Sequence, residues 1–321
     1  MHHLLRARRR YGPIRTRGYR SRLSFGPAMQ PRPIDLDRDM PGIADLLGHT
    51  RAAGGLSHPG GIQWWLRGLG KDGFDDLAAY VWAADDGSIG GFALVDGEFV
   101  VHERLGSGPT DLEQVAWLEG ELLAKGRGAI EFHVAEGDPF RAELEARGYR
   151  QHGSELELVA DVTAEPERGP LPDGFRIGSL LDVTDDAYIA GHVAAWSDTK
   201  PSSYRRELHD VVTSMPQFRP DLVTVVIAPD GRVAACTIGW LDAQSATLEI
   251  EPLGTHRDFR RLGLGRVIVK EVQHRAWANG ATRVLVWNSP ETNPAAYALY
   301  TGAGMPINRT LELLRKDLAA P

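Results

Sequence analysis

Three arginines and two glycines lie within seven residues, from Arg260 to Arg266, in the segment RRLGLGR. Gly263 and Gly265 allow a bulky anion to approach the backbone without meeting a Cβ atom. A helix that starts here points the amides of its first turn outward, and its dipole favours negative charge at that end. The arginines add bidentate donors. The segment therefore predicts a pyrophosphate cradle, although it is neither a P-loop nor a dinucleotide fingerprint, because the lysine and the glycine spacing of those motifs are missing.

Two helices and a strand must position this cradle. Leu264, Ile268, Val272 and Ala276 follow at helical spacing and form one apolar stripe, and Asn279-Gly280 ends that helix. The apolar run 284–287 predicts a central strand that is covered on both faces. A second helix follows from Asn293, with Pro294 in its first turn and Gly304 as its stop. Because 28 residues separate Gly265 from Asn293, we expect the two helices side by side across a parallel strand.

The remainder of the second half alternates strand and helix signals. Alternation, helical spacing and turn residues predict further strands and helices in this order: a strand at 175–180, helices at 185–198 and 202–215, a hairpin of 222–228 and 232–242 around the turn 229–231, a strand at 245–251, and a closing strand at 309–318. In the strand 245–251, Glu249 and Glu251 point to one face, and Leu248 and Ile250 point to the other. The fold class is therefore α/β with a mixed sheet.

The first half of the chain repeats this order faintly. The turn Asp86-Gly87 lies 144 residues before Asp230-Gly231, and Gly148 lies 156 residues before Gly304. The first half carries an amphipathic helix where the cradle would be, but no R-x-x-G-x-G. We therefore expect a tandem duplication with one altered copy. It has a basic, disordered extension at 1–28, a degenerate domain at 29–162, a linker at 163–173 and a catalytic domain at 174–321.

The paired motifs RRLGLG and N-x-x-A-x-x-L-Y-x-x-x-G resemble those of the GNAT superfamily, the Gcn5-related N-acetyltransferases. The resemblance is strong over 174–318 and extends to 31–162 as topology alone. Tandem GNAT domains with the intact site in the second copy are similar to mycothiol synthase and related bacterial proteins. One departure is Arg257, where relatives commonly have proline, and it puts the geometry of the local loop in doubt.

The resemblance implies that acetyl-CoA is the acyl donor and that no metal takes part. The cofactor-binding residues that it implies form three groups. Its pantetheine would pair with the backbone of Leu253 and Thr255, with Gly254 between them, and Asn288 and Asn293 would contact the pantetheine or its neighbourhood. Its pyrophosphate would lie on the amides from Arg261 to Gly265, which include Leu262, Gly263 and Leu264, and Arg260 and Arg266 are further cofactor-binding residues. Tyr300 would donate a proton to the departing thiolate. An ammonium acceptor must lose a proton before it attacks, and Glu251 is the candidate base. An amide near Leu253 could stabilise the oxyanion.

For the acceptor, a small-molecule amine, the segment between the first two helices supplies Trp196, Ser203, Tyr204 and Arg206, and Glu249 is a further candidate. Packing at the surface is the alternative role for the first four, as core packing is for Tyr300. Glu251 could also bind a cationic acceptor without acting as the base. Mycothiol synthase proper, which acetylates a cysteinyl amine, is one alternative function. A non-catalytic acyl-CoA sensor is another.

Composition limits the partners. The 321 residues have a net charge of −7, and the 28 residues at the N-terminus hold eight arginines and no acid. Without them, 28 basic residues stand against 43 acidic ones, a net of −15 that repels nucleic acid. The only cysteine, Cys236, lies in an apolar run and is expected in the core. No apolar run is long enough to span a membrane. We expect a cytoplasmic monomer or homodimer.

Overall fold

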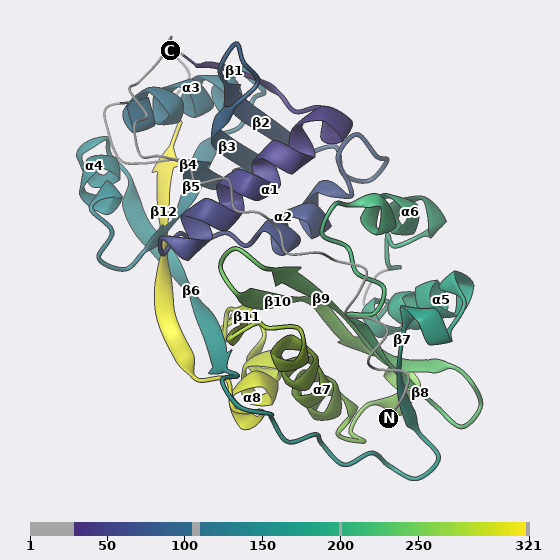
Figure 1. The fold of residues 1–321 in the computed structure, drawn as a ribbon. Helices are drawn as coiled ribbons and strands as arrows, with labels where there is room; N and C mark the ends of the chain where they lie inside the picture. The colour runs from purple at the N-terminus through teal and green to yellow at the C-terminus, as the bar shows by residue number, and fades with distance from the viewer. Residues whose placement is uncertain (1–28, 105–109, 199–200, 319–321) are drawn as a thin grey trace.

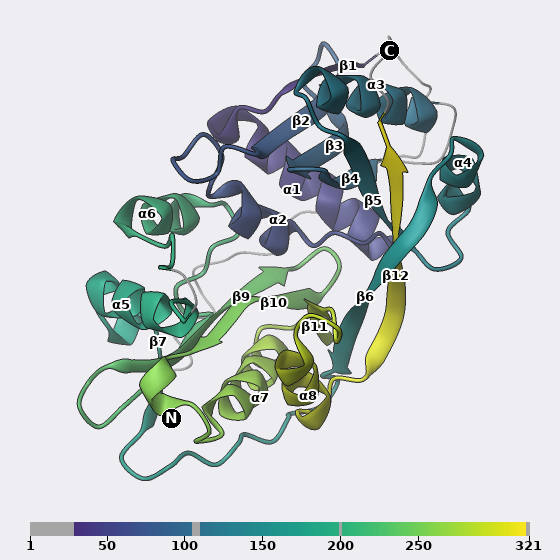
Figure 2. The same cartoon turned by 180° about the vertical axis from the view of Figure 1, so that it is seen from behind.

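The computed structural model describes residues 29–104, 110–198 and 201–318. The predictions for the segment 1–28 lie outside these ranges. Within them, one mixed sheet of twelve strands runs through both halves of the chain, and helices pack against it (Figures 1 and 2). The α/β prediction is confirmed. Among the described residues, no helix has the length and apolar character to cross a membrane.

The strands and helices follow in similar order in the two halves. The first half contains β1 (Gln30–Pro33), α1 (Leu36–Ala52), α2 (Pro59–Leu66), β2 (Leu77–Ala83), β3 (Ile89–Asp96), β4 (Phe99–Arg104), α3 (Thr110–Ala124), β5 (Ala129–Ala135), α4 (Phe140–Ala146) and β6 (Arg150–Asp161). The second half contains β7 (Arg176–Ser179), η2 (Leu180–Asp182), α5 (Asp185–Trp196), α6 (Arg206–Ser214), β8 (Val223–Ile227), β9 (Val233–Asp242), β10 (Thr247–Thr255), η3 (Arg257–Phe259), α7 (Leu264–Ala278), β11 (Arg283–Asn288), α8 (Pro294–Gly302) and β12 (Ile307–Asp317). Each predicted element of the second half is present, with α6 starting later than expected.

The two halves exchange their last strands. The strand order is β1-β2-β3-β4-β5-β12-β6-β11-β10-β9-β8-β7, so β12 of the second half lies between β5 and β6, and β6 of the first half lies between β12 and β11. Figures 1 and 2 show β6 and β12 side by side where the halves meet. The fully buried Glu157 of β6 is paired with Arg51 of α1 and, at 3.0 Å, with Arg309 of β12. The chain is therefore two halves of similar element order joined through one sheet.

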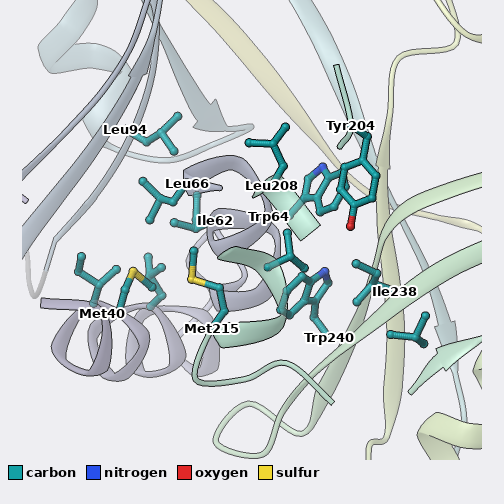
Figure 3. Close-up of a cluster of buried hydrophobic side chains, with 14 of the residues drawn as sticks. Met40, Ile62, Trp64, Leu66, Leu94, Tyr204, Leu208, Met215, Ile238 and Trp240 are labelled. Carbon is teal, nitrogen blue, oxygen red and sulfur yellow. The ribbon is translucent and has the colours of Figure 1, made fainter. Parts of the chain in front are cut away.

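Three hydrophobic clusters fill the interior. One lies under α7 and α8 in the second half, and it buries the predicted stripe of Leu264, Ile268, Val272 and Ala276. A second lies under α3 and α4 in the first half. The third joins the halves, because residues of α1 and α2 such as Met40 and Trp64 belong to the same cluster as Tyr204 and Trp240 (Figure 3). Cys236 also lies in this shared core, as predicted, and is 1% exposed.

Candidate active site

The two central parallel strands, β10 and β11, separate partway along their length. β10 and β11 pair at three positions, the last being Glu249 with Leu285. β10 nevertheless continues along β9 as far as Thr255, with a register shift between Ile250 and Leu253. The edge of β10 that faces β11 is therefore unpaired from about Leu253 to Thr255. An edge with free amides and carbonyls can accept an extended, amide-containing ligand as an additional strand.

The arginine–glycine segment lies at the start of α7, which follows β10. Gly263 precedes the helix with φ of 78°, a left-handed conformation that glycine adopts without a Cβ penalty. No side chain caps this end of the helix, so the first-turn amides remain free for an anion. Arg261 and Arg266 are exposed and have no ion pair within the described part of the chain. Leu262 is also exposed, whereas Leu264 is buried in the core.

Two residues of the predicted cradle have other contacts. Arg260 donates to Ala195 O at 2.8 Å and to Thr255 O at 3.2 Å, and it pairs with Asp198 at 2.6 Å. Its guanidinium therefore ties the loop after β10 to the end of α5. A Cβ atom at Gly265 would lie 3.1 Å from the Leu299 side chain, so this glycine allows α7 to approach α8 closely. Arg261, Gly263 and Arg266 are the members that remain open to an anion.

A cavity of about 530 Å³ lies at the separation of the strands, between the halves. Its lining includes Glu249 and Glu251 on one wall, as the alternation along β10 predicts. Glu251 is half-buried, and burial, together with the negative charge of Glu249, raises its pKa to about 8. The Glu249 carboxylate accepts a 2.7 Å hydrogen bond from the Gly61 amide of α2. Near neutral pH, Glu251 can therefore both hold and release a proton.

Three of the predicted residues come from β11 and from the start and body of α8. Tyr300 does not line the cavity: it is 6% exposed and packs in the hydrophobic cluster under α7 and α8, and burial and the charge of Glu251 raise its pKa, so the phenol keeps its proton. Asn288 and Asn293 line the cavity. Asn288 is buried, and its Oδ1 has no hydrogen-bond partner within the described residues. The Asn293 side chain caps α8 by accepting from the Ala296 amide at 3.2 Å, so its Oδ1 has a structural role.

Comparison with known families now identifies the second half. Residues 181–305 match the model of the acetyltransferase (GNAT) family. The chain contains a GNAT domain. The strands that separate and the helix start with free amides both lie inside the matched region. The comparison with curated proteins finds no match.

Solved structures extend the likeness to the entire fold. A GCN5-related N-acetyltransferase from Sphaerobacter thermophilus is 20% identical, with 91% of this chain and 96% of that chain covered and a TM-score of 0.56. A tandem GNAT protein from the clavulanic acid biosynthesis pathway is 13% identical, with 91% and 99% covered and a TM-score of 0.59. A GNAT-family acetyltransferase from Colwellia psychrerythraea is 12% identical, with 89% and 100% covered and a TM-score of 0.54. The likeness shows that the fold expected for the two halves is shared with these structures over most of the chain, and one of them is a tandem GNAT protein.

Four of the predicted acceptor residues lie away from the cavity, whereas Glu249 lines it. Tyr204 is buried, its ring stacks 4.0 Å from that of His192, and its hydroxyl lies 2.9 Å from His209 Nδ1. Trp196 stacks on His192 at 4.2 Å and covers Gly254, where an added Cβ would lie 2.3 Å from the indole. Ser203 is exposed. None of these three lines the cavity, so the prediction that they bind the acceptor has no support from this geometry. Arg206 pairs with Asp185 and Asp186.

The first half contributes cavity residues that the sequence argument missed. They are His58, which caps the start of α2, and four residues of β4 to β6: Glu103, Glu131, His133 and Glu155. A signal was present, because Glu131 and His133 occupy alternate positions in the otherwise apolar strand AIEFHVA. Polar side chains on one face of a buried strand indicate a wet cavity. No group of three or more His, Cys, Asp or Glu that could hold a metal ion occurs within the described ranges.

Proposed function

We propose that the protein is an acetyl-CoA-dependent N-acetyltransferase that acts on a primary amine of a small molecule. One observation carries this proposal: β10 and β11 separate beside the free amides of α7, and Glu251 lies on the cavity wall at the same place. A donor site and an acceptor site thus meet at one point of the sheet. The GNAT match supports acyl transfer in general.

The residues at this point suit acetyl-CoA. The unpaired edge from Leu253 to Thr255 has amides and carbonyls for the two amide groups of the pantetheine arm. The first-turn amides of α7, with Arg261 and Arg266, offer donors and positive charge for the pyrophosphate. When bound, acetyl-CoA supplies the acetyl group as a thioester that is already activated for attack by an amine.

Glu251 is the proposed general base. An aliphatic ammonium is a poor nucleophile until it loses a proton, and a carboxylate with a pKa of about 8 accepts that proton more readily than an ordinary glutamate does. The proton then passes to a partly enclosed carboxyl group beside Glu249. Because only ionised Glu251 acts as the base, its contribution increases as the pH rises through about 8.

Tyr300 is the proposed general acid. Its phenol is protonated at neutral pH, because burial and the charge of Glu251 raise its pKa. A tyrosine in this place can protonate the CoA thiolate that leaves. The tyrosine would then regain a proton from the groups around it. The contacts of Asn288 and Asn293 to the pantetheine or its neighbourhood, the oxyanion donor near Leu253, and the domain boundaries at 29–162 and 174–321 belong to the proposal as predictions.

The test compares the double variant Arg261→Ala/Arg266→Ala with wild type in an assay of CoA release with small amines. We expect the KM for acetyl-CoA to rise about tenfold or more, because two charge-assisted contacts are lost, with kcat changed little. Arg176→Ala, at an exposed arginine of the distant edge strand β7, is the matched control. Absence of CoA release with every amine, together with absence of acetyl-CoA binding, would contradict the proposal. Binding without turnover would support the sensor alternative.

A further inference from the structure

A row of carboxylates crosses the cavity from one half of the molecule to the other. Glu249 and Glu251 lie on β10, Glu155 on β6 and Glu131 on β5, and all four line the cavity. Adjacent members influence each other: the charges of Glu249 and Glu155 act on Glu251, and the charge of Glu131 acts on Glu155. The row therefore extends well beyond the two glutamates that the acetyl-transfer step involves.

The protein compensates this negative charge only in part: the charge of Arg67 opposes the rise in the pKa of Glu251, and His58 Nδ1 lies 3.3 Å from Glu249. No lysine or arginine among the described residues lines the cavity. Within the described ranges, the one basic partner of Glu155 is His133, at 3.9 Å, and burial lowers the pKa of His133 to about 4, so the imidazole is neutral at physiological pH. The one basic partner of Glu131 among the same residues is the exposed His152, at 3.6 Å. Like charges gathered in a partly enclosed cavity raise each other's pKa values and favour a bound cation.

A separate feature of the cavity also indicates a missing donor. Asn288 lines the cavity and is 7% exposed, yet its Oδ1 has no hydrogen-bond partner among the described residues. A buried amide oxygen without a donor costs free energy, so such groups are usually satisfied by a ligand or by ordered water. A ligand with N–H groups would satisfy it. Apolar surface from Trp287, Leu311 and Leu313 lies in the same lining.

From the carboxylate row and the unpaired Asn288 we infer that the acceptor carries at least two amino groups. One ammonium lies at Glu249 and Glu251 and reacts, and a second lies at Glu155 and Glu131 in the first half. The aliphatic segment between them packs on Leu311 and Leu313. This inference rests on the proposed function for the identity of the reacting amine, and it gives the first half of the chain a role in substrate binding.

The test measures spermidine binding to the full-length protein by calorimetry, with butylamine as the matched monoamine. We expect butylamine to bind at least tenfold more weakly than spermidine, since it can neutralise only one end of the row. The double variant Glu131→Gln/Glu155→Gln should weaken spermidine binding at least tenfold and leave butylamine binding within about twofold. Glu136→Gln, at an exposed glutamate just after β5, should change neither.

Equal affinities for spermidine and butylamine, no binding of either amine, or an unchanged spermidine affinity in the double variant would each overturn the inference. The single variant Glu131→Gln, at the end of the row, provides the same comparison if the double variant does not fold. The binding readout is separate from turnover. If spermidine binds as expected but no acetyl-CoA binds and no CoA is released, the proposed function fails while the polycation site remains.

Discussion

The two halves of the molecule share local geometry at matched positions. Gly87 and Gly231 both have positive φ, and their amides donate at 2.9 Å to Ala84 O and Ala228 O. After α4 and α8, the amides of Tyr149 and Met305 return to Leu144 O and Tyr300 O at 3.1 and 3.0 Å. In the first half, β4 and β5 pair at two positions, so their parallel pairing is even shorter than the three-position pairing of β10 and β11.

The chemistry at these matched positions differs. Leu144, fully buried, takes the place of Tyr300, and Gly137 takes the place of Asn293 when the halves are aligned on Gly148 and Gly304. Glu103 of β4 accepts hydrogen bonds from the amides of Leu56 and Ser57, and this holds the chain before α2 in place. The two halves therefore share the same backbone scaffold, whereas the groups suited to acyl transfer occur together in the second half.

The largest effect is expected from Glu251→Gln. Loss of the base should lower kcat/KM about 10³-fold at pH 8. The ratio of wild-type to variant rates should grow as the pH rises through about 8, because wild-type Glu251 ionises over that range and the amide does not. The matched change in the first half, Glu103→Gln, should stay within a few-fold of wild type, as seen in a pH–rate profile of CoA release. Similar losses of kcat/KM in Glu251→Gln and Glu103→Gln would contradict the expected difference between the two halves.

Tyr300→Phe should lower kcat about 10²-fold, because the acid that protonates the leaving thiolate is removed. The affinity for acetyl-CoA should stay within about twofold of wild type, since the ring and its packing remain. Tyr149→Phe makes the same change in the first half, where the hydroxyl donates to Glu119 at 3.0 Å, and should leave kcat unchanged. Steady-state kinetics of Tyr300→Phe and Tyr149→Phe test this prediction. An unchanged kcat in Tyr300→Phe would assign the tyrosine to packing alone.

A smaller effect is expected from Gly263→Ala. The left-handed φ at this position should cost about 1 kcal/mol of stability in the alanine variant. A shift of the α7 start would also raise the Kd for acetyl-CoA several-fold. Gly126→Ala, after α3, changes a glycine with φ of 75° and open space around it. Thermal melting should show equal destabilisation in both variants, and calorimetry should show weaker acetyl-CoA binding in Gly263→Ala alone.

The sequence was sufficient for the local features of the second half. Strand alternation placed Glu249 and Glu251 on one face, and helical spacing identified the buried stripe of α7. In contrast, the local sequences of β6 and β12 do not indicate that each strand completes the part of the sheet that belongs to the other half. The cavity depends on that exchange, so its residues from β5 and β6 could not be assembled from motifs alone. The ties of Arg260 to Ala195 and Asp198 are likewise contacts between distant segments.

The most direct test of the difference between the halves is a calorimetric titration of acetyl-CoA into the full-length protein, read for stoichiometry as well as affinity. The account predicts one site per chain, located in the second half. That site should be weakened by Arg261→Ala/Arg266→Ala and unaffected by Arg176→Ala. Two sites per chain would show that the first half retains a working cradle, and no binding would contradict the assignment of the second half as the acetyl-CoA site.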